Sequence, residues 1–158
     1  MANGWRLKVL ADSSQDHVKD ALEDESTRIL AFCESNELAM EKIGAHRHHI
    51  PPIRHVNCGL LPTSVNSWSI AAEALDPMLG GWVHVHENFA LEEIEEKAEE
   101  VRKAFQRLVQ ATDQIRYAGR PCVQPPRHVE VEHIQRVKSY APGVFHCVVD
   151  IHVPQLPV

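Results

Sequence analysis

The sequence predicts an α/β fold in which a largely parallel sheet is covered by helices and ends in an antiparallel hairpin. Three observations lead to this prediction. Short apolar runs alternate with segments of helical periodicity, a long amphipathic helix follows them, and two strand-like segments joined by a tight turn come last. Alternating strands and helices are typical of parallel sheets, because each helix crosses over a face of the sheet.

The first part of the chain contains four short apolar runs, separated by segments whose apolar residues recur at helical spacing. The runs that we expect to form strands are 7–10, 29–33, 55–61 and 82–86. The segments that we expect to form helices are 16–22, 37–44 and 67–75.

The longest helix is expected from Leu91 to about Thr112, where apolar residues recur in steps of three and four. This spacing places them on one stripe that must face the sheet. Glu92 and Glu93 lie in the first turn, where negative charge stabilises the helix dipole. Asn88 is a suitable cap just upstream.

The chain is expected to end in a hairpin. Residues 119–127 contain three prolines and are predicted to form a loop. Two strands are then expected at 129–140 and 144–153, joined by Ala141-Pro142-Gly143. Because a tight turn brings consecutive strands side by side, this pair should be antiparallel.

Length and charge restrict the function classes. The 158 residues are 44% hydrophobic, and their formal charge is −6. No stretch is apolar enough to span a bilayer and no signal-peptide pattern is present, so a cytoplasmic protein is expected. No basic stripe is visible, so most contacts to the phosphates of an RNA substrate would come from regions outside this chain. The four cysteines form no C-x-x-C pair and are expected to be buried thiols.

The segment most informative about chemistry is Arg54–Ser64, RHVNCGLLPTS. A strand runs into Asn57 and Gly59, and Pro62 precedes the polar residues that open the next helix. Ligands of open α/β sheets bind at the carboxyl ends of the strands. An asparagine there offers both donors and acceptors to the edge of a planar base, and the proline stiffens the loop. An Asn/Gly/Pro turn with no function is the alternative interpretation.

The run RHVNCGLLPTS…SW, followed by GGWVHVHEN and VEHIQRVKSYAPGVFHCVVDIHV, resembles the tRNA wybutosine-synthesising protein 2 family. With FCESNELAMEKIG upstream, the resemblance covers about residues 27 to 153. The family is related to the tRNA guanine methyltransferases. The resemblance implies the class I methyltransferase (Rossmann-like) fold, of which this chain is the C-terminal half.

The resemblance also implies a reaction. The family moves the 3-amino-3-carboxypropyl group of S-adenosyl-L-methionine to the 4-demethylwyosine base of tRNA(Phe), without a catalytic nucleophile or a metal. By position, Asn57 and Pro62 match the family's motif at the transfer site. Asn36 matches an asparagine near the adenine of the cofactor. Glu34 and Ser35 stand where the family has Gly-Asp, and they are expected to take over that polar role.

The glycine-rich loop and the acidic ribose-binding residue of the family have no counterpart in this chain. Residues 1–158 are therefore interpreted as a single partial transferase domain that lacks half of the cofactor pocket and is not expected to catalyse alone. The missing strands should leave a sheet edge exposed, which favours self-association.

Two other functions are compatible with the sequence. One is a catalytically dead Rossmann-like binding or scaffold module. The other is a metal-dependent hydrolase using His84, His86 and Glu87. A His-x-His pair supplies only two of the three protein ligands that a catalytic zinc requires, so no metal site is predicted.

Overall fold

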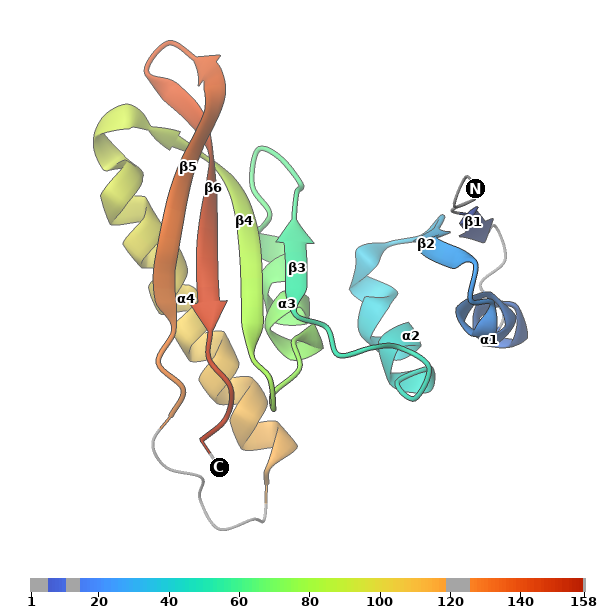
Figure 1. Cartoon of the computed structure of the whole chain (residues 1–158). Coiled ribbons are helices and arrows are strands. Elements are labelled where there is room, and N and C mark those ends of the chain that lie inside the picture. Colours follow the sequence, from blue (N-terminus) through green and yellow to red (C-terminus); the bar gives the residue numbers. More distant parts are fainter. Residues whose placement is uncertain (1–5, 11–14, 119–125, 158) are drawn as a thin grey trace. The chain divides into compact units, whose positions relative to one another are not determined.

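A computed structural model describes residues 6–10, 15–118 and 126–157 of the chain. The chain divides into two compact units, Met1–Pro51 and Pro52–Val158, and each is described by itself (Figure 1).

The first unit contains two parallel strands, β1 (Arg6–Leu10) and β2 (Thr27–Phe32), joined by helix α1 (Gln15–Glu23). Val18 and Ala21 are buried, since their spacing of three puts them on the face of α1 that contacts the strands. A 3-10 turn at Asn36–Leu38 follows β2 and leads into α2 (Ala39–Ala45).

The second unit is a four-stranded sheet with two main helices. Its elements are β3 (His55–Cys58), α3 (Trp68–Ala74), β4 (Gly81–Ala90), α4 (Ile94–Arg116), β5 (Glu130–Ala141) and β6 (Val144–Val153). The strand order is β3-β4-β6-β5, with β3 and β4 parallel and the other pairs antiparallel. In the described part of this unit, β3 is therefore an outer strand with one open edge.

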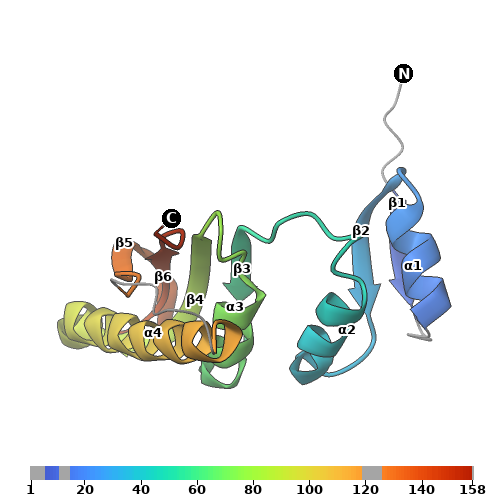
Figure 2. The same ribbon diagram turned by 90° about the horizontal axis from the view of Figure 1, so that it is seen from below.

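Helices α3 and α4 lie against one face of this sheet (Figure 2). Alternate residues of β4 point into the core, and Val83 and Val85 are fully buried there. Phe105 and Val109 of α4 are fully buried as well, on the stripe that the helical spacing predicts. The opposite face of the sheet carries no helix of this unit in the described residues.

Two features hold the ends of the elements together. A Cβ atom on Gly81 would lie 2.2 Å from the Arg54 carbonyl oxygen, so only glycine lets β3 and β4 begin this close together. At the same end of the sheet, the guanidinium of Arg127 makes two hydrogen bonds to the carboxylate of Asp113, at 2.7 and 2.9 Å. Arg127 is 4% exposed, so this ion pair is largely shielded from water, and it fixes the segment before β5 to α4.

The predicted fold class is confirmed, with parallel strands followed by an antiparallel hairpin. The four expected parallel strands differ in arrangement, because β1-β2 and β3-β4 belong to separate sheets in the described residues. The expectation of a single partial domain stays a prediction. Among the described residues, no helix combines the length and the apolar composition that crossing a bilayer requires.

Candidate functional site

The loop after β3 carries the residues expected at the transfer site. β3 ends at Cys58, and the chain turns through Gly59 and a cis Leu61–Pro62 peptide before α3 begins. Asn57 is exposed at the end of the strand. This loop lies at the carboxyl end of β3, beside the C-terminal half of the parallel strand β4, and ligands of open α/β sheets bind at the carboxyl ends of strands.

A buried carboxylate on β4 holds this loop. Oε1 of Glu87 accepts hydrogen bonds from the Ser64 backbone N–H at 2.8 Å and the Ser64 hydroxyl at 3.1 Å. It also accepts one from the Thr63 hydroxyl at 3.0 Å. Ser64 in turn accepts a 2.9 Å hydrogen bond from the Trp68 indole N–H. Glu87 is 7% exposed and Ser64 fully buried, so the network is shielded from water and fixes the end of the loop.

The Glu87 charge also affects its neighbour Cys58. Burial, and secondarily the negative charge of Glu87, raise the pKa of the Cys58 thiol to about 11. Cys58 and Cys147 are buried as expected, but Cys33 is exposed, and Cys122 lies outside the described residues. A thiol with this pKa stays protonated at neutral pH and is a poor nucleophile.

The uncovered face of the sheet carries a network of histidines. His55 Nδ1 lies 3.0 Å from His84 Nε2, and His84 Nδ1 lies 2.7 Å from the Asp150 carboxylate. Two residues further along β4, His86 Nδ1 lies 3.0 Å from His146 Nε2. Neighbouring strands thus pair imidazoles across the face, with their ring nitrogens hydrogen-bonded to one another.

An indole lies at the other end of this face. The Trp82 ring stacks on His55, with 5.0 Å between centroids and 11° between planes. On its β6 side, Trp82 contacts the His152 ring at 5.0 Å. Its N–H donates to the Glu132 carboxylate. Trp82 is therefore flanked by imidazoles from both neighbouring strands.

The structure contradicts a metal site made of His84, His86 and Glu87. The two histidines face the uncovered side of the sheet, whereas Glu87 points into the helix-covered side toward Ser64. Successive residues of a strand point to opposite faces, so the three side chains cannot meet. In the described residues, no three His, Cys, Asp or Glu side chains are placed to hold a metal ion.

The first unit contains a separate cavity of about 440 Å³ between β2, α1 and α2. Its walls are mostly aliphatic, with the Phe32 ring among them, and its lining residues are Val18, Leu22, Leu30, Phe32, Glu34, Ser35, Asn36, Ala39, Lys42, Ile43 and Ile50.

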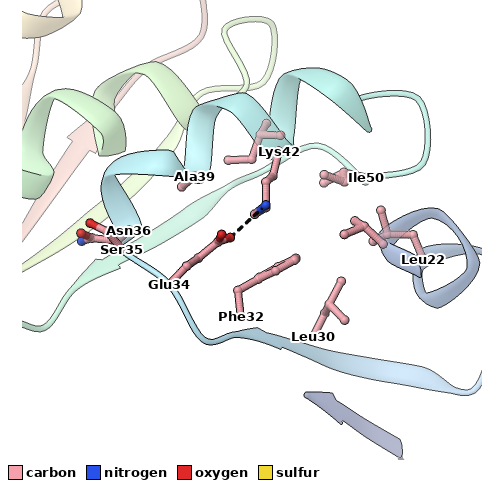
Figure 3. A pocket seen from close by; sticks show the side chains of 11 residues that line it. Leu22, Leu30, Phe32, Glu34, Ser35, Asn36, Ala39, Lys42 and Ile50 are labelled. Atoms are coloured by element: carbon pink, nitrogen blue, oxygen red, sulfur yellow. Dashed lines mark ion pairs between the residues drawn. The ribbon is translucent and has the colours of Figure 1, made fainter. Parts of the chain in front are cut away.

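The polar residues of this cavity come from the turn after β2 and from α2. Figure 3 shows Glu34 beside Lys42, and their ion pair measures 3.0 Å. The Lys42 ammonium also lies 5.5 Å from the Phe32 ring centroid. The Ser35 hydroxyl accepts a 3.3 Å hydrogen bond from the backbone of the following turn. Apolar walls with a few polar groups at one end suit a planar heteroaromatic ligand.

The structure brings the predicted site residues together in two groups. Glu34, Ser35 and Asn36 line the cavity of the first unit. In the second unit, Asn57 lies near the end of β3 and Pro62 lies on the loop that follows it. Sequence reasoning missed the role of Glu87. A signal for it is present in the sequence, because Glu87 occupies an inward-facing position of β4 and the other inward-facing positions are apolar or glycine.

Comparison with known proteins gives relatives along almost the whole chain. The chain is 32% identical to tRNA wybutosine-synthesizing protein 2 of Schizosaccharomyces pombe over 151 residues, which are 96% of this chain and 30% of that protein. It is 40% identical to tRNA wybutosine-synthesizing protein 2/3/4 of Arabidopsis thaliana over 96 residues, covering 61% of this chain and 8% of that protein.

The chain thus spans less than a third of the length of the curated relatives it matches. Among solved structures, M. jannaschii TYW2 in complex with AdoMet superposes with a TM-score of 0.52 at 14% identity, covering 96% of this chain and 58% of that one. This likeness shows the fold. No protein-family model matches the chain.

Proposed function

Because the chain is a homologue of tRNA wybutosine-synthesizing protein 2 over 96% of its length, we propose that it acts in the same tRNA modification, as the part of the transferase that holds the transfer site. The substrate is the 4-demethylwyosine base of tRNA(Phe), and the donor is S-adenosyl-L-methionine. The observation that carries the proposal is the strand-end loop with Asn57, anchored by the buried Glu87.

The cavity of the first unit supports cofactor binding. Its aliphatic walls and the Phe32 ring match the faces of an adenine, and Glu34, Ser35 and Asn36 supply polar atoms for the edge of the ring. When bound, S-adenosyl-L-methionine supplies an alkyl group on a sulfonium, which is already a good leaving group. The residues of this chain would then orient the two reactants, and orientation is the main contribution that such a transfer needs from a protein.

In the second unit, Asn57 would hydrogen-bond the edge of the acceptor base. Pairing of β3 with β4 holds Asn57, and the Glu87 network keeps Thr63 and Ser64 in place, so both ends of the loop beside Asn57 are fixed before the substrate arrives. With a net charge of −6, the chain is expected to leave most phosphate contacts to other regions of a longer protein or to a partner.

The open edge of β3 is the proposed self-association site. A row of unpaired backbone groups accepts a strand from another chain. Sedimentation velocity over a range of concentrations would show a concentration-dependent dimer if this is right, and a single monomeric species if it is wrong. The proposed location of the protein is the cytoplasm.

The experiment for the proposed function starts with calorimetric titration of the purified chain with S-adenosyl-L-methionine. Saturable binding that Glu34→Ala or Phe32→Ala weakens at least tenfold would support the cofactor site. The second stage follows the release of methylthioadenosine with tRNA(Phe) carrying the precursor base. Release that Asn57→Ala abolishes while cofactor binding persists supports the transfer site. A folded chain that neither binds the cofactor nor releases product overturns the proposed function and leaves the scaffold alternative.

A further inference from the structure

His86 occupies a position beside the strand-end loop that the proposed function does not yet use. β3 and β4 pair from His55 opposite Trp82 to Cys58 opposite Val85. His86 therefore lies one residue beyond the last pair, level with Gly59, where the loop begins. Its side chain faces the uncovered side of the sheet, the same side as Asn57, since Asn57 pairs with His84 two residues earlier.

The His86 ring is held in one orientation. Its Nδ1 lies 3.0 Å from Nε2 of His146, and the two ring centroids are 5.2 Å apart. His146 is 8% exposed and so has little freedom to move, whereas His86 is only half-buried. Because the contact with His146 uses Nδ1, the nitrogen that His86 can offer to a ligand is Nε2.

The surroundings keep His86 uncharged near neutral pH. Burial lowers its pKa below the usual 6.5, the neighbouring His146 and His84 lower it further, and Asp150 on β6 acts in the opposite direction. On β5, the charged residue in register with His146 is Lys138. An imidazole that is neutral and accessible at working pH is suited to general base catalysis.

We propose that His86 accepts the proton that the acceptor base loses during the transfer, with His146 as its positioning residue. This inference rests on the proposed function. In the transfer, the carbon–sulfur bond breaks and its electron pair stays on sulfur, while a ring carbon of the base forms the new carbon–carbon bond. The hydrogen on that ring carbon leaves as a proton, which Nε2 of His86 takes up and later releases to water.

The proposal requires one of the two neutral tautomers. His86 must carry its proton on Nδ1 and donate it to Nε2 of His146, so that Nε2 of His86 keeps its lone pair. His146 then carries its own proton on Nδ1, a buried atom with no partner among the described residues. Asn88 pairs with His146 across the two strands, and its buried amide oxygen also lacks a partner. The Asn88 amide nitrogen lacks a partner as well, and the structure shows no hydrogen bond between Asn88 and His146, so the tautomer is a requirement of the proposal that NMR can check.

The first test uses nitrogen-15 NMR of the full wild-type chain and needs no activity. The expected spectrum shows His86 protonated on Nδ1 at pH 7.5, with a pKa below the usual 6.5. His146→Gln should change both the tautomer ratio and the pKa of His86. A His86 protonated on Nε2, or one that titrates as a solvated imidazole and ignores His146→Gln, overturns the proposal.

The second test measures single-turnover release of methylthioadenosine. His86→Asn should lose at least about 100-fold in rate, as expected for removal of a general base, with unchanged affinity for S-adenosyl-L-methionine. His152→Asn, the matched control, should stay within about twofold. His146→Gln should give a smaller loss and shift the acid limb of the pH–rate profile, which the loss of a merely structural contact would not do.

The outcomes separate the two proposals. If the wild type is active and His86→Asn keeps the same rate, the role of His86 is overturned but the proposed function is not. A wild type that binds S-adenosyl-L-methionine but releases no product from the correct tRNA overturns the proposed function, and the inference falls with it. Circular dichroism of each variant checks folding, and the NMR test on the wild type stands if a variant fails to fold.

Discussion

Removing the Glu87 carboxylate should release the far end of the loop that follows β3. Glu87→Ala leaves the buried Ser64 backbone N–H and hydroxyl without their acceptor, while the exposed Thr63 hydroxyl can turn to water. An unsatisfied buried N–H costs about 2 kcal/mol and a hydroxyl about 1 kcal/mol, so the variant should lose about 3 kcal/mol of unfolding free energy. Glu87→Gln keeps one acceptor oxygen and should lose about 1 kcal/mol.

Urea unfolding followed by circular dichroism measures the loss, and hydrogen exchange of the Ser64 amide locates it. Exchange at Ser64 should be slow in the wild type and much faster in Glu87→Ala. Glu100→Ala is the control, because Glu100 forms an exposed ion pair with Lys97 and its removal should cost less than about 0.5 kcal/mol. If Glu87→Ala is as stable as Glu100→Ala, the network does not hold the loop and the reasoning is wrong.

Three further predictions concern the packing and the titration of the fold. Arg127→Met should lower the unfolding free energy by about 3 kcal/mol, because it leaves a mostly buried carboxylate without its partner. Lys97→Met, at an exposed ion pair, should leave the unfolding free energy nearly unchanged, and equal losses for the two variants in urea would contradict this. A thiol reagent should label the exposed Cys33 in the native protein and the buried Cys58 only after unfolding, as peptide mass mapping will show. The pKa of His86 is lower in the folded than in the unfolded chain, so the unfolded chain binds the proton more readily. The unfolding free energy should therefore fall as the pH drops through about 6.5. Urea titrations at several pH values should show a weaker pH dependence for His86→Gln.

Local patterns were sufficient to predict most elements of the fold. The apolar stripe of α4 and the turn between β5 and β6 are local signals, and both are present in the structure. The limits of strands were harder to place. β4 continues to Ala90 beyond the predicted residue 86, because Phe89 keeps the inward alternation after two polar residues interrupt the apolar run. β3 stops at Cys58, before the apolar residues of the loop.

In the candidate site, too, only the features that follow from a local sequence pattern could be predicted. The position of Asn57 at a strand end was predictable, because a strand followed by Gly and Pro is a local pattern. The hydrogen bond from Ser64 to Glu87 joins residues 23 apart in the chain, so it exists only once β3 and β4 are side by side. Likewise, a lone histidine at position 146 carries no signal until the antiparallel register places it across from β4.

The indole of Trp82, flanked by His55 and His152, gives this face an optical property. A protonated imidazole quenches indole fluorescence more strongly than a neutral one does. Emission from Trp82 should therefore respond to a ligand that covers the face and alters the charge of these imidazoles. In a variant whose other two tryptophans, Trp5 and Trp68, are replaced by phenylalanine, light emitted by this one side chain would report occupancy of the sheet face in real time, without an attached dye.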